Sequence, residues 1–164
     1  MSLIAGDKAP DFTLTTKTPE GPQPIRLSDN FGKQNTVLLF FPMVYTGVCT
    51  QEMCDISSGL GAYTKIGATV YGISGDNPFA QEAWAQTNKI TVPLLSDYDH
   101  KVARAYGVAY EKFLPQLNLG YGGVAKRSAF VVDKAGVIRY AESNDDPGKL
   151  PNFDAIKQTL ATLK

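Results

Sequence analysis

Residues 36–49 are Thr-Val-Leu-Leu-Phe-Phe-Pro-Met-Val-Tyr-Thr-Gly-Val-Cys, and the predicted architecture is arranged around this stretch. Its first six residues form a continuous apolar run rich in strand-forming side chains, which is typical of a central strand buried on both faces. Pro42 lacks a backbone N–H and ends the strand. A helix is predicted over about residues 47–65, although two glycines weaken its later turns. The stretch therefore predicts a strand, a turn and a helix, with Cys49 in the first helical turn.

Predicted strands and helices alternate along the rest of the chain. They are a strand at 68–74, a helix from Pro78 to about Lys89 capped by Asp76-Asn77, a short strand at 93–96, a short helix at 99–106, a hairpin of 127–133 with 137–142, and a helix at 152–163. Before the central strand, residues 6–35 are broken by prolines and glycines and predict turns and short edge strands. This order predicts an α/β fold with a central mixed sheet flanked by helices, in the thioredoxin order with an N-terminal extension. We expect residues 1–164 to form a single domain.

Composition indicates a globular protein and excludes several partner classes. The chain is 43% hydrophobic and 20% charged, and its 16 basic residues balance its 16 acidic ones. Because neither sign is concentrated in any stretch, no nucleic-acid or anionic-membrane partner is expected. The longest apolar run, 37–44, is too short to span a bilayer. Residues 1–8 show no secretory signal, so we expect a cytoplasmic, bacterial protein.

The two cysteines, Cys49 and Cys54, are too few for a disulfide framework. They could be inert buried thiols, metal ligands or a redox pair. A zinc site needs further Cys or His residues nearby, and the single histidine, His100, is far along the chain. Cys49 lies beyond the carboxyl end of a strand and near a helix start, where unpaired backbone N–H groups and the helix dipole favour a thiolate.

Three neighbours of Cys49 also have simpler structural explanations. Thr46 can cap the helix, or its hydroxyl can point toward the sulfur. Pro42 can be a plain strand terminator. Glu52 lies one turn after Cys49, where a carboxylate ordinarily responds to the helix dipole.

Taken together, Pro42, Thr46 and Cys49 form a Pro-x-x-x-Thr-x-x-Cys pattern, and with it the sequence resembles the peroxiredoxin family, the AhpC/TSA or thiol-specific antioxidant type. Further segments that resemble the family are Gly6-Asp7-Lys8-Ala9-Pro10-Asp11-Phe12-Thr13-Leu14, Leu94-Leu95-Ser96-Asp97, Ala105-Tyr106-Gly107-Val108 and Lys126-Arg127-Ser128-Ala129-Phe130-Val131-Val132-Asp133. By the last of these matches, Arg127 corresponds to the active-site arginine of the family.

The resemblance implies a thiol peroxidase that acts on hydrogen peroxide and organic hydroperoxides. The Cys49 thiolate would attack a peroxide oxygen and become a sulfenic acid. Arg127 would hold a positive charge near the sulfur, and Thr46 would hydrogen-bond the peroxide. Pro42 would shield the site from water, and Glu52 would orient the arginine. No metal, flavin or haem is required by this chemistry.

Cys54 decides the subtype. On an ideal helix its Cα lies about 8–9 Å from that of Cys49, beyond the roughly 4.4–6.8 Å that a disulfide allows, so a bond between them requires the helix to unwind. The Cys-x-x-x-x-Cys spacing resembles the PrxQ group, also called bacterioferritin comigratory proteins, in which the second cysteine resolves the sulfenic acid. Residues 40–49 and 136–142 resemble the AhpE type more closely. The resemblance thus implies a Cys49–Cys54 disulfide reduced by thioredoxin or a glutaredoxin-like donor, or else a Cys54 that is a passive helix residue.

Two other functions are compatible with the cysteine pair. A thioredoxin-like disulfide oxidoreductase normally uses Cys-x-x-Cys, but Thr46 occupies the first of those positions. A redox-responsive sensor or holdase could use oxidation only to change shape. A monomer or a homodimer is expected.

The segment 108–126 lacks clear periodicity and is unusually long for a loop in a compact domain. It carries the apolar side chains Tyr110, Phe113, Leu114, Leu117, Leu119 and Tyr121. The segment could cover the active site, form a subunit contact or fold onto the core.

Overall fold

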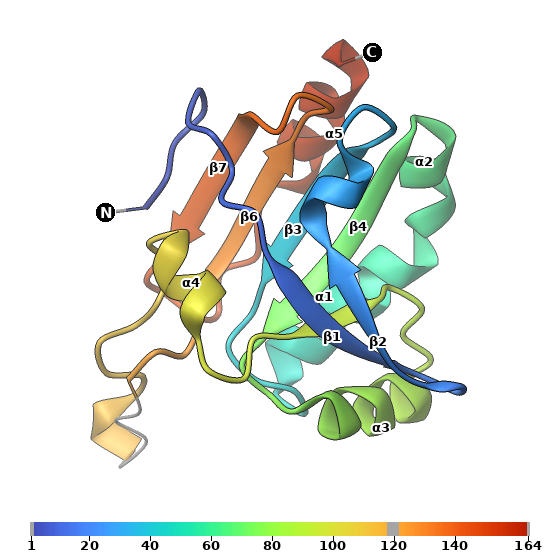
Figure 1. The fold of residues 1–164 in the computed structure, drawn as a ribbon. Coiled ribbons are helices and arrows are strands. Elements are labelled where there is room, and N and C mark those ends of the chain that lie inside the picture. The colour runs from blue at the N-terminus through green and yellow to red at the C-terminus, as the bar shows by residue number, and fades with distance from the viewer. Residues whose placement is uncertain (1, 118–121, 164) are drawn as a thin grey trace.

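The computed structural model describes residues 2–117 and 122–163. Seven strands in these residues form one mixed sheet in the order β2-β1-β5-β4-β3-β6-β7 (Figure 1). They are β1 (Thr13–Thr18), β2 (Gly21–Arg26), β3 (Asn35–Phe40), β4 (Ala68–Ser74), β5 (Leu94–Ser96), β6 (Arg127–Val132) and β7 (Ile138–Asn144). The helices are α1 (Gly47–Ser58), α2 (Leu60–Lys65), α3 (Pro78–Asn88), α4 (Lys101–Ala105) and α5 (Phe153–Thr162), with short 3-10 turns η1 (Leu27–Asn30) and η2 (Pro115–Leu117). The α/β, thioredoxin-like architecture predicted from the sequence is confirmed.

The central strand β3 is buried along its whole length, as its apolar run predicts. It pairs in parallel with β4, where Leu38 faces Tyr71, and antiparallel with β6, where Phe40 faces Ser128. The observed strand begins at Asn35 and ends at Phe40, one residue earlier at each end than predicted.

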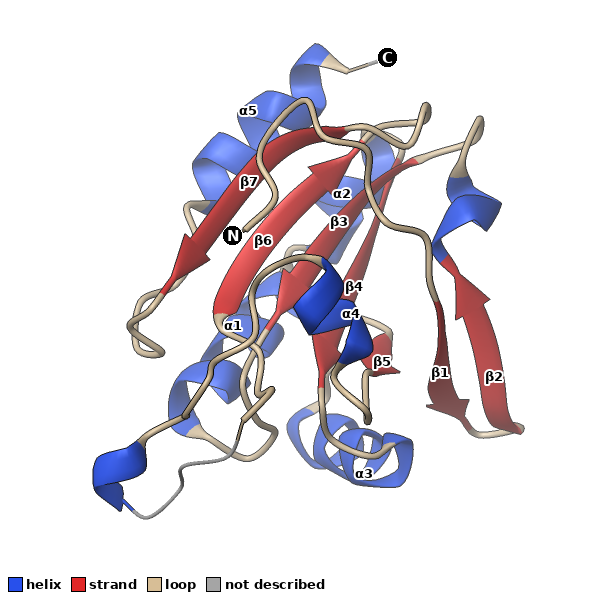
Figure 2. Ribbon diagram, turned by 60° about the vertical axis from the view of Figure 1, so that its left-hand side comes forward, coloured by secondary structure: helices blue, strands red, loops and turns tan. Residues whose placement is uncertain are grey.

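Alternate side chains of β3 enter two separate cores, because successive strand residues point to opposite faces. Val37 and Leu39 pack with residues of α1, α2, α3 and α5. Leu38 and Phe40 pack with residues of α4 and of the N-terminal segment. Figure 2 shows α4 in front of the sheet and α1, α2 and α5 behind it. The sheet is therefore covered on both faces, which explains its continuous apolar strands.

The helix predicted over 47–65 is divided at Gly59 into α1 and α2. The Gly59 N–H still donates to the carbonyl groups of Asp55 and Ile56, so α1 closes with its own backbone bonds. Predicted helix starts are confirmed at α3 and α5, where Asn77 and Asn152 each accept a hydrogen bond from a first-turn N–H. The helix predicted at 99–106 is shorter and begins only at Lys101.

The N-terminal region forms the edge strands that its prolines and glycines predict. β1 and β2 are an antiparallel hairpin, and β1 joins the sheet where Thr15 faces Ser96 of β5. Pro22 and Pro24 lie in β2, the outermost strand, where a missing N–H donor is tolerated.

Both ends of the 108–126 segment fold onto the body of the protein. Ala109 and Ala125 form an isolated bridge, and Phe113 is buried. Leu117 is exposed. Leu119 and Tyr121 lie outside the described residues. Of the helices in the described part of the chain, none combines the length and apolar character that a membrane crossing requires.

Candidate active site

The topology brings together two segments that are far apart in sequence. β3 and β6 are antiparallel, so the carboxyl end of β3 and the amino end of β6 meet at one edge of the sheet. Since Phe40 faces Ser128, Arg127 lies beside the exit of β3. Alternate residues of a strand point to the same face, so Arg127 shares its face of β6 with Ala129 and Val131, which pack in the core formed with α1. The arginine therefore points toward the first turns of α1.

Each of the three guanidinium nitrogens of Arg127 has a contact in the structure. Its Nη2 lies 3.0 Å from the Sγ of Cys49, its Nη1 donates to Oε1 of Glu52 at 2.8 Å, and its Nε donates to the carbonyl of Pro147 at 2.9 Å. The residue is 2% exposed. Three partners in fixed directions hold the planar group, and the charge is directed at the sulfur.

Cys49 is 1% exposed and is the third residue of α1. The first intrahelical bond runs from the Thr50 N–H to the Thr46 carbonyl at 2.9 Å. The N–H groups of Gly47, Val48 and Cys49 therefore precede the hydrogen-bonded ladder and form the positive end of the helix. The guanidinium of Arg127 and the start of α1 together place positive charge around the Cys49 sulfur.

Glu52 is completely buried one turn below Cys49. Its Oε1 accepts from Arg127, while its Oε2 has no hydrogen-bond partner in the described protein. Burial raises the pKa of Glu52 to about 7, and the charge and hydrogen bond of Arg127 oppose this rise. The carboxyl thus titrates near neutrality, unlike an exposed glutamate in a helix.

Thr46 and Pro42 lie in the loop between β3 and α1. Thr46 occupies the N-cap position, but its hydroxyl donates to the Met43 carbonyl at 2.9 Å instead of accepting from a helix N–H. Pro42 is buried just beyond the strand end. Tyr45, between them, has a positive φ of 65°. The loop therefore has a specific, locally strained conformation beside the sulfur.

Cys54 is on the same helix as Cys49, and both thiols are free. The Cys54 thiol is half-buried and contacts the Asn88 carbonyl at 3.5 Å. Ideal helix geometry places the two Cα atoms about 8–9 Å apart, too far for a disulfide. The intact helix thus separates the two sulfurs.

Six residues were predicted for the site: Pro42, Thr46, Cys49, Glu52, Cys54 and Arg127. In the structure Arg127 contacts both Cys49 and Glu52, and Pro42 and Thr46 lie in the adjoining loop. Cys54 faces α3 instead, as shown by its contact with Asn88.

Sequence reasoning missed two contacts of this region. Trp84, which is fully buried, donates from Nε1 to the Thr50 hydroxyl in α1 at 3.0 Å. Asp76, predicted only as part of a helix cap, accepts from the Val44 N–H at 3.0 Å. The available signal for Asp76 was its position just after β4, because the ends of parallel strands meet at one edge.

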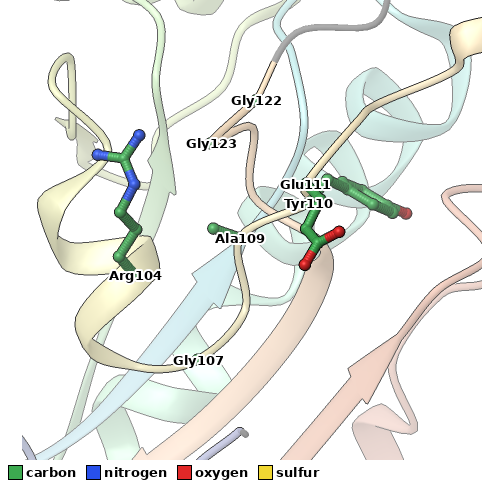
Figure 3. A pocket seen from close by; sticks show the side chains of 7 residues that line it. All are labelled: Arg104, Gly107, Ala109, Tyr110, Glu111, Gly122 and Gly123. Carbon is green, nitrogen blue, oxygen red and sulfur yellow. The ribbon is translucent and has the colours of Figure 1, made fainter.

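A hollow of about 540 Å³ lies elsewhere on the molecule (Figure 3). It is lined by Arg104, Gly107, Ala109, Tyr110, Glu111, Gly122 and Gly123. None of the six predicted site residues lines this hollow. Cys49, Glu52 and Arg127 are thus brought together by the sheet topology, away from this hollow.

A family model described as the AhpC/TSA family matches residues 5–141. Alkyl hydroperoxide reductase E of Mycobacterium tuberculosis is 34% identical over 163 residues, covering 98% of each chain. A chloroplastic 2-cysteine peroxiredoxin of Chattonella marina is 33% identical over 172 residues, covering 100% of this chain and 82% of that protein.

The chain is also similar to solved structures. Peroxidoxin BcpB of Mycobacterium tuberculosis matches with a TM-score of 0.82 and 28% identity over 99% of both chains. AhpC of Enterococcus faecalis matches with a TM-score of 0.80 and 27% identity, covering 98% of this chain and 92% of that one.

Proposed function

Because the chain belongs to the AhpC/TSA family of peroxiredoxins and is a thiol peroxidase, we propose that Cys49 is its peroxide-reducing residue. The observation that carries the assignment is the 3.0 Å contact between Arg127 Nη2 and the Cys49 sulfur. The thiolate sulfur attacks one peroxide oxygen, the S–O bond forms and the O–O bond breaks. The departing oxygen takes a proton and leaves as water or an alcohol. Sulfur is thereby oxidised to a sulfenic acid as the peroxide is reduced.

Arg127 stabilises the charge at both stages of this reaction. Its guanidinium faces the thiolate before attack, and it remains beside the negative charge that develops on the peroxide oxygens. The unpaired N–H groups of Val48 and Cys49 add positive potential from the helix start. These donors are fixed before the substrate arrives, so little reorganisation is needed in the transition state.

Thr46 and Pro42 define where the peroxide lies. The Thr46 hydroxyl uses its proton on the Met43 carbonyl, so its lone pairs are available to accept from the peroxide O–H. Pro42 has no N–H and is buried, and it therefore adds an apolar wall that keeps water from the sulfur. Both roles suit hydrogen peroxide and organic hydroperoxides, which share the O–O–H group.

Glu52 orients Arg127 instead of acting as a base. Its Oε1 holds Nη1, which turns Nη2 toward Cys49. When Glu52 carries a proton, the arginine charge is balanced by the thiolate alone. A pKa of about 7 makes this protonated form well populated at neutral pH.

Cys54 resolves the sulfenic acid in the proposed cycle. Its sulfur attacks the Cys49 sulfur, a disulfide forms and water leaves. For this the first turns of α1 must unwind, which breaks the Arg127–Cys49 contact and the Thr50–Trp84 bond. A dithiol protein of the thioredoxin or glutaredoxin-like type then reduces the disulfide and allows α1 to re-form.

The setting of this cycle is a reducing cytoplasm, with the protein as a monomer or a homodimer. In such a compartment protein thiols are kept reduced and permanent disulfides are rare. A dithiol donor is also available there to complete each cycle.

The test is peroxide consumption with a thioredoxin system as electron donor. Wild-type protein is expected to turn over, and Cys49→Ser is expected to have no activity above the uncatalysed rate. Activity retained by Cys49→Ser would remove Cys49 from the reaction. A wild-type protein that reacts once with peroxide but does not turn over with any dithiol donor would point to a redox sensor.

A further inference from the structure

The loop that carries Pro42 and Thr46 is attached to the sheet through Asp76. Oδ2 of Asp76 accepts from the Val44 N–H at 3.0 Å. Among the described residues, this is the one hydrogen bond that ties positions 42–46 to any part of the protein beyond α1. We propose that Asp76 is a positioning residue that fixes this loop over the Cys49 sulfur, an inference that rests on the roles proposed above for Cys49 and Thr46.

Asp76 is itself held by a buried network. The Ser74 hydroxyl donates to Oδ2 of Asp76 at 2.6 Å, and Gln81 Nε2 donates to the Ser74 oxygen at 3.0 Å. Since the Gln81 amide nitrogen can only donate, the Ser74 proton must point at Asp76. Gln81 also binds the Leu95 carbonyl at 2.9 Å, and the Ser96 hydroxyl donates to the Asp76 carbonyl at 2.6 Å. Strands β4 and β5 and helix α3 thus fix the carboxylate that holds the loop.

The loop needs such an anchor because its own conformation is unfavourable. Tyr45 follows Val44 directly and has a φ of 65°, a left-handed backbone that residues with a Cβ rarely adopt. Packing holds Val44 against the core formed with α1 but leaves the side of the loop at Pro42 and Met43 open. A cavity of about 350 Å³, lined by Pro42, Met43, Asp76 and His100 among others, lies beside it. A fixed acceptor for the Val44 N–H selects the observed conformation over the alternatives.

Loop position and sulfur activation come from different parts of the fold. Thr46 takes its place from the loop, whereas Arg127 reaches Cys49 from β6 and depends on Glu52 and Pro147. Losing the Asp76 carboxylate therefore displaces the peroxide-binding hydroxyl but leaves the thiolate environment intact. The effect is expected in the reaction with peroxide and not in reactions that need only a thiolate.

The experiment compares two second-order rates of the full-length reduced protein, one for hydrogen peroxide and one for iodoacetamide. We expect Asp76→Ala to lower the peroxide rate about 10- to 100-fold, since displacements near 1 Å have effects of this size, with the alkylation rate within about threefold of wild type. Asp76→Asn keeps an oxygen acceptor for the Val44 N–H and should retain most of the peroxide rate. Asp7→Ala is the matched control, because Asp7 accepts the Ile4 N–H far from the site.

The proposal is overturned if Asp76→Ala reacts with peroxide like wild type, or if both rates fall together. Should Asp76→Ala fail to fold by circular dichroism, Ser74→Ala carries the test with the same criteria. It removes one support of the carboxylate and is expected to give a smaller loss, confined to the peroxide rate. A wild-type Cys49 that does not react with peroxide would contradict the proposed function itself and is distinguished by the wild-type measurement alone.

Discussion

Arg127 and Cys49 are 78 residues apart in sequence, and the guanidinium Nη2 of one lies 3.0 Å from the sulfur of the other. The antiparallel pairing of β3 with β6 makes this contact, because it places the amino end of one strand beside the carboxyl end of the other. The sheet topology therefore brings a positive charge to the Cys49 sulfur, in addition to the positive end of its own helix.

Arg127→Gln should lower the rate of the first reaction with peroxide about 10²- to 10³-fold, the usual effect of removing one preorganised donor. The peroxide rate of Arg127→Lys should lie between those of wild type and Arg127→Gln, because lysine keeps the charge but cannot hold Cys49, Glu52 and Pro147 together. Stopped-flow oxidation measures the rate, and thiolate absorbance measures the ionised fraction. Arg139→Gln, on β7, is the control and should react like wild type. Equal rates for Arg127→Gln and wild type would contradict the role of the arginine.

Cys54→Ser should separate the two halves of the cycle. The rate of the first oxidation should not change, because Cys54 contacts Asn88 and not the reactive sulfur. Steady-state turnover with a thioredoxin system should fall at least about tenfold, since no disulfide can form. Mass spectrometry should then detect accumulating sulfinic acid at Cys49. Undiminished turnover by this variant would make Cys54 a passive helix residue.

Trp84 should report the unwinding of α1, because it is the single tryptophan and is bonded to Thr50. Treating reduced protein with peroxide is expected to change its fluorescence, and dithiothreitol should reverse the change. In Cys54→Ser the part of the fluorescence change that accompanies disulfide formation should be absent, because without a disulfide the helix does not unwind. A disulfide that forms with no change in fluorescence would show that the helix start does not move.

Glu52 should make the stability of the protein depend on pH. Its pKa is about 7 in the folded protein and 4.5 ordinarily, so its contribution to stability is fully present below pH 4.5 and is lost as the pH rises toward 7. Glu52→Gln cannot ionise and should lack this slope. Urea unfolding measures the free energy of unfolding of both proteins. The value for wild type minus the value for Glu52→Gln should fall by up to about 3 kcal/mol over that pH window. Parallel curves would mean that the buried carboxyl does not hold its proton.

The strands that build the site could be predicted from local pattern alone. The apolar runs gave β3, β4 and β6, and Pro42 marked the end of the first. Since the helix was predicted to begin at about residue 47, after this turn, Cys49 could be placed in its first turn. The choice of Arg127 among the other basic residues came from a resemblance to the family, because no local pattern tells which arginine will face a distant cysteine.

Contacts set by loop geometry could not be predicted. The Val44–Asp76 bond depends on a loop in which Tyr45 takes a left-handed backbone, and no propensity favours that conformation for tyrosine. The Trp84–Thr50 bond depends on how closely α3 packs against α1. The helix break at Gly59, rather than at Gly61, was equally beyond a propensity argument, since both glycines weaken a helix alike.

The most direct test of the central claim is stoichiometric oxidation. Reduced protein receives one equivalent of hydrogen peroxide, remaining thiols are alkylated, and intact mass with peptide mapping locates the product. We predict loss of two hydrogens in a peptide that joins Cys49 to Cys54. A sulfenic or sulfinic Cys49 beside an alkylated Cys54 would keep the peroxidase and exclude the disulfide. If both cysteines remain reduced after minutes with peroxide, Cys49 is not the reactive residue of this protein.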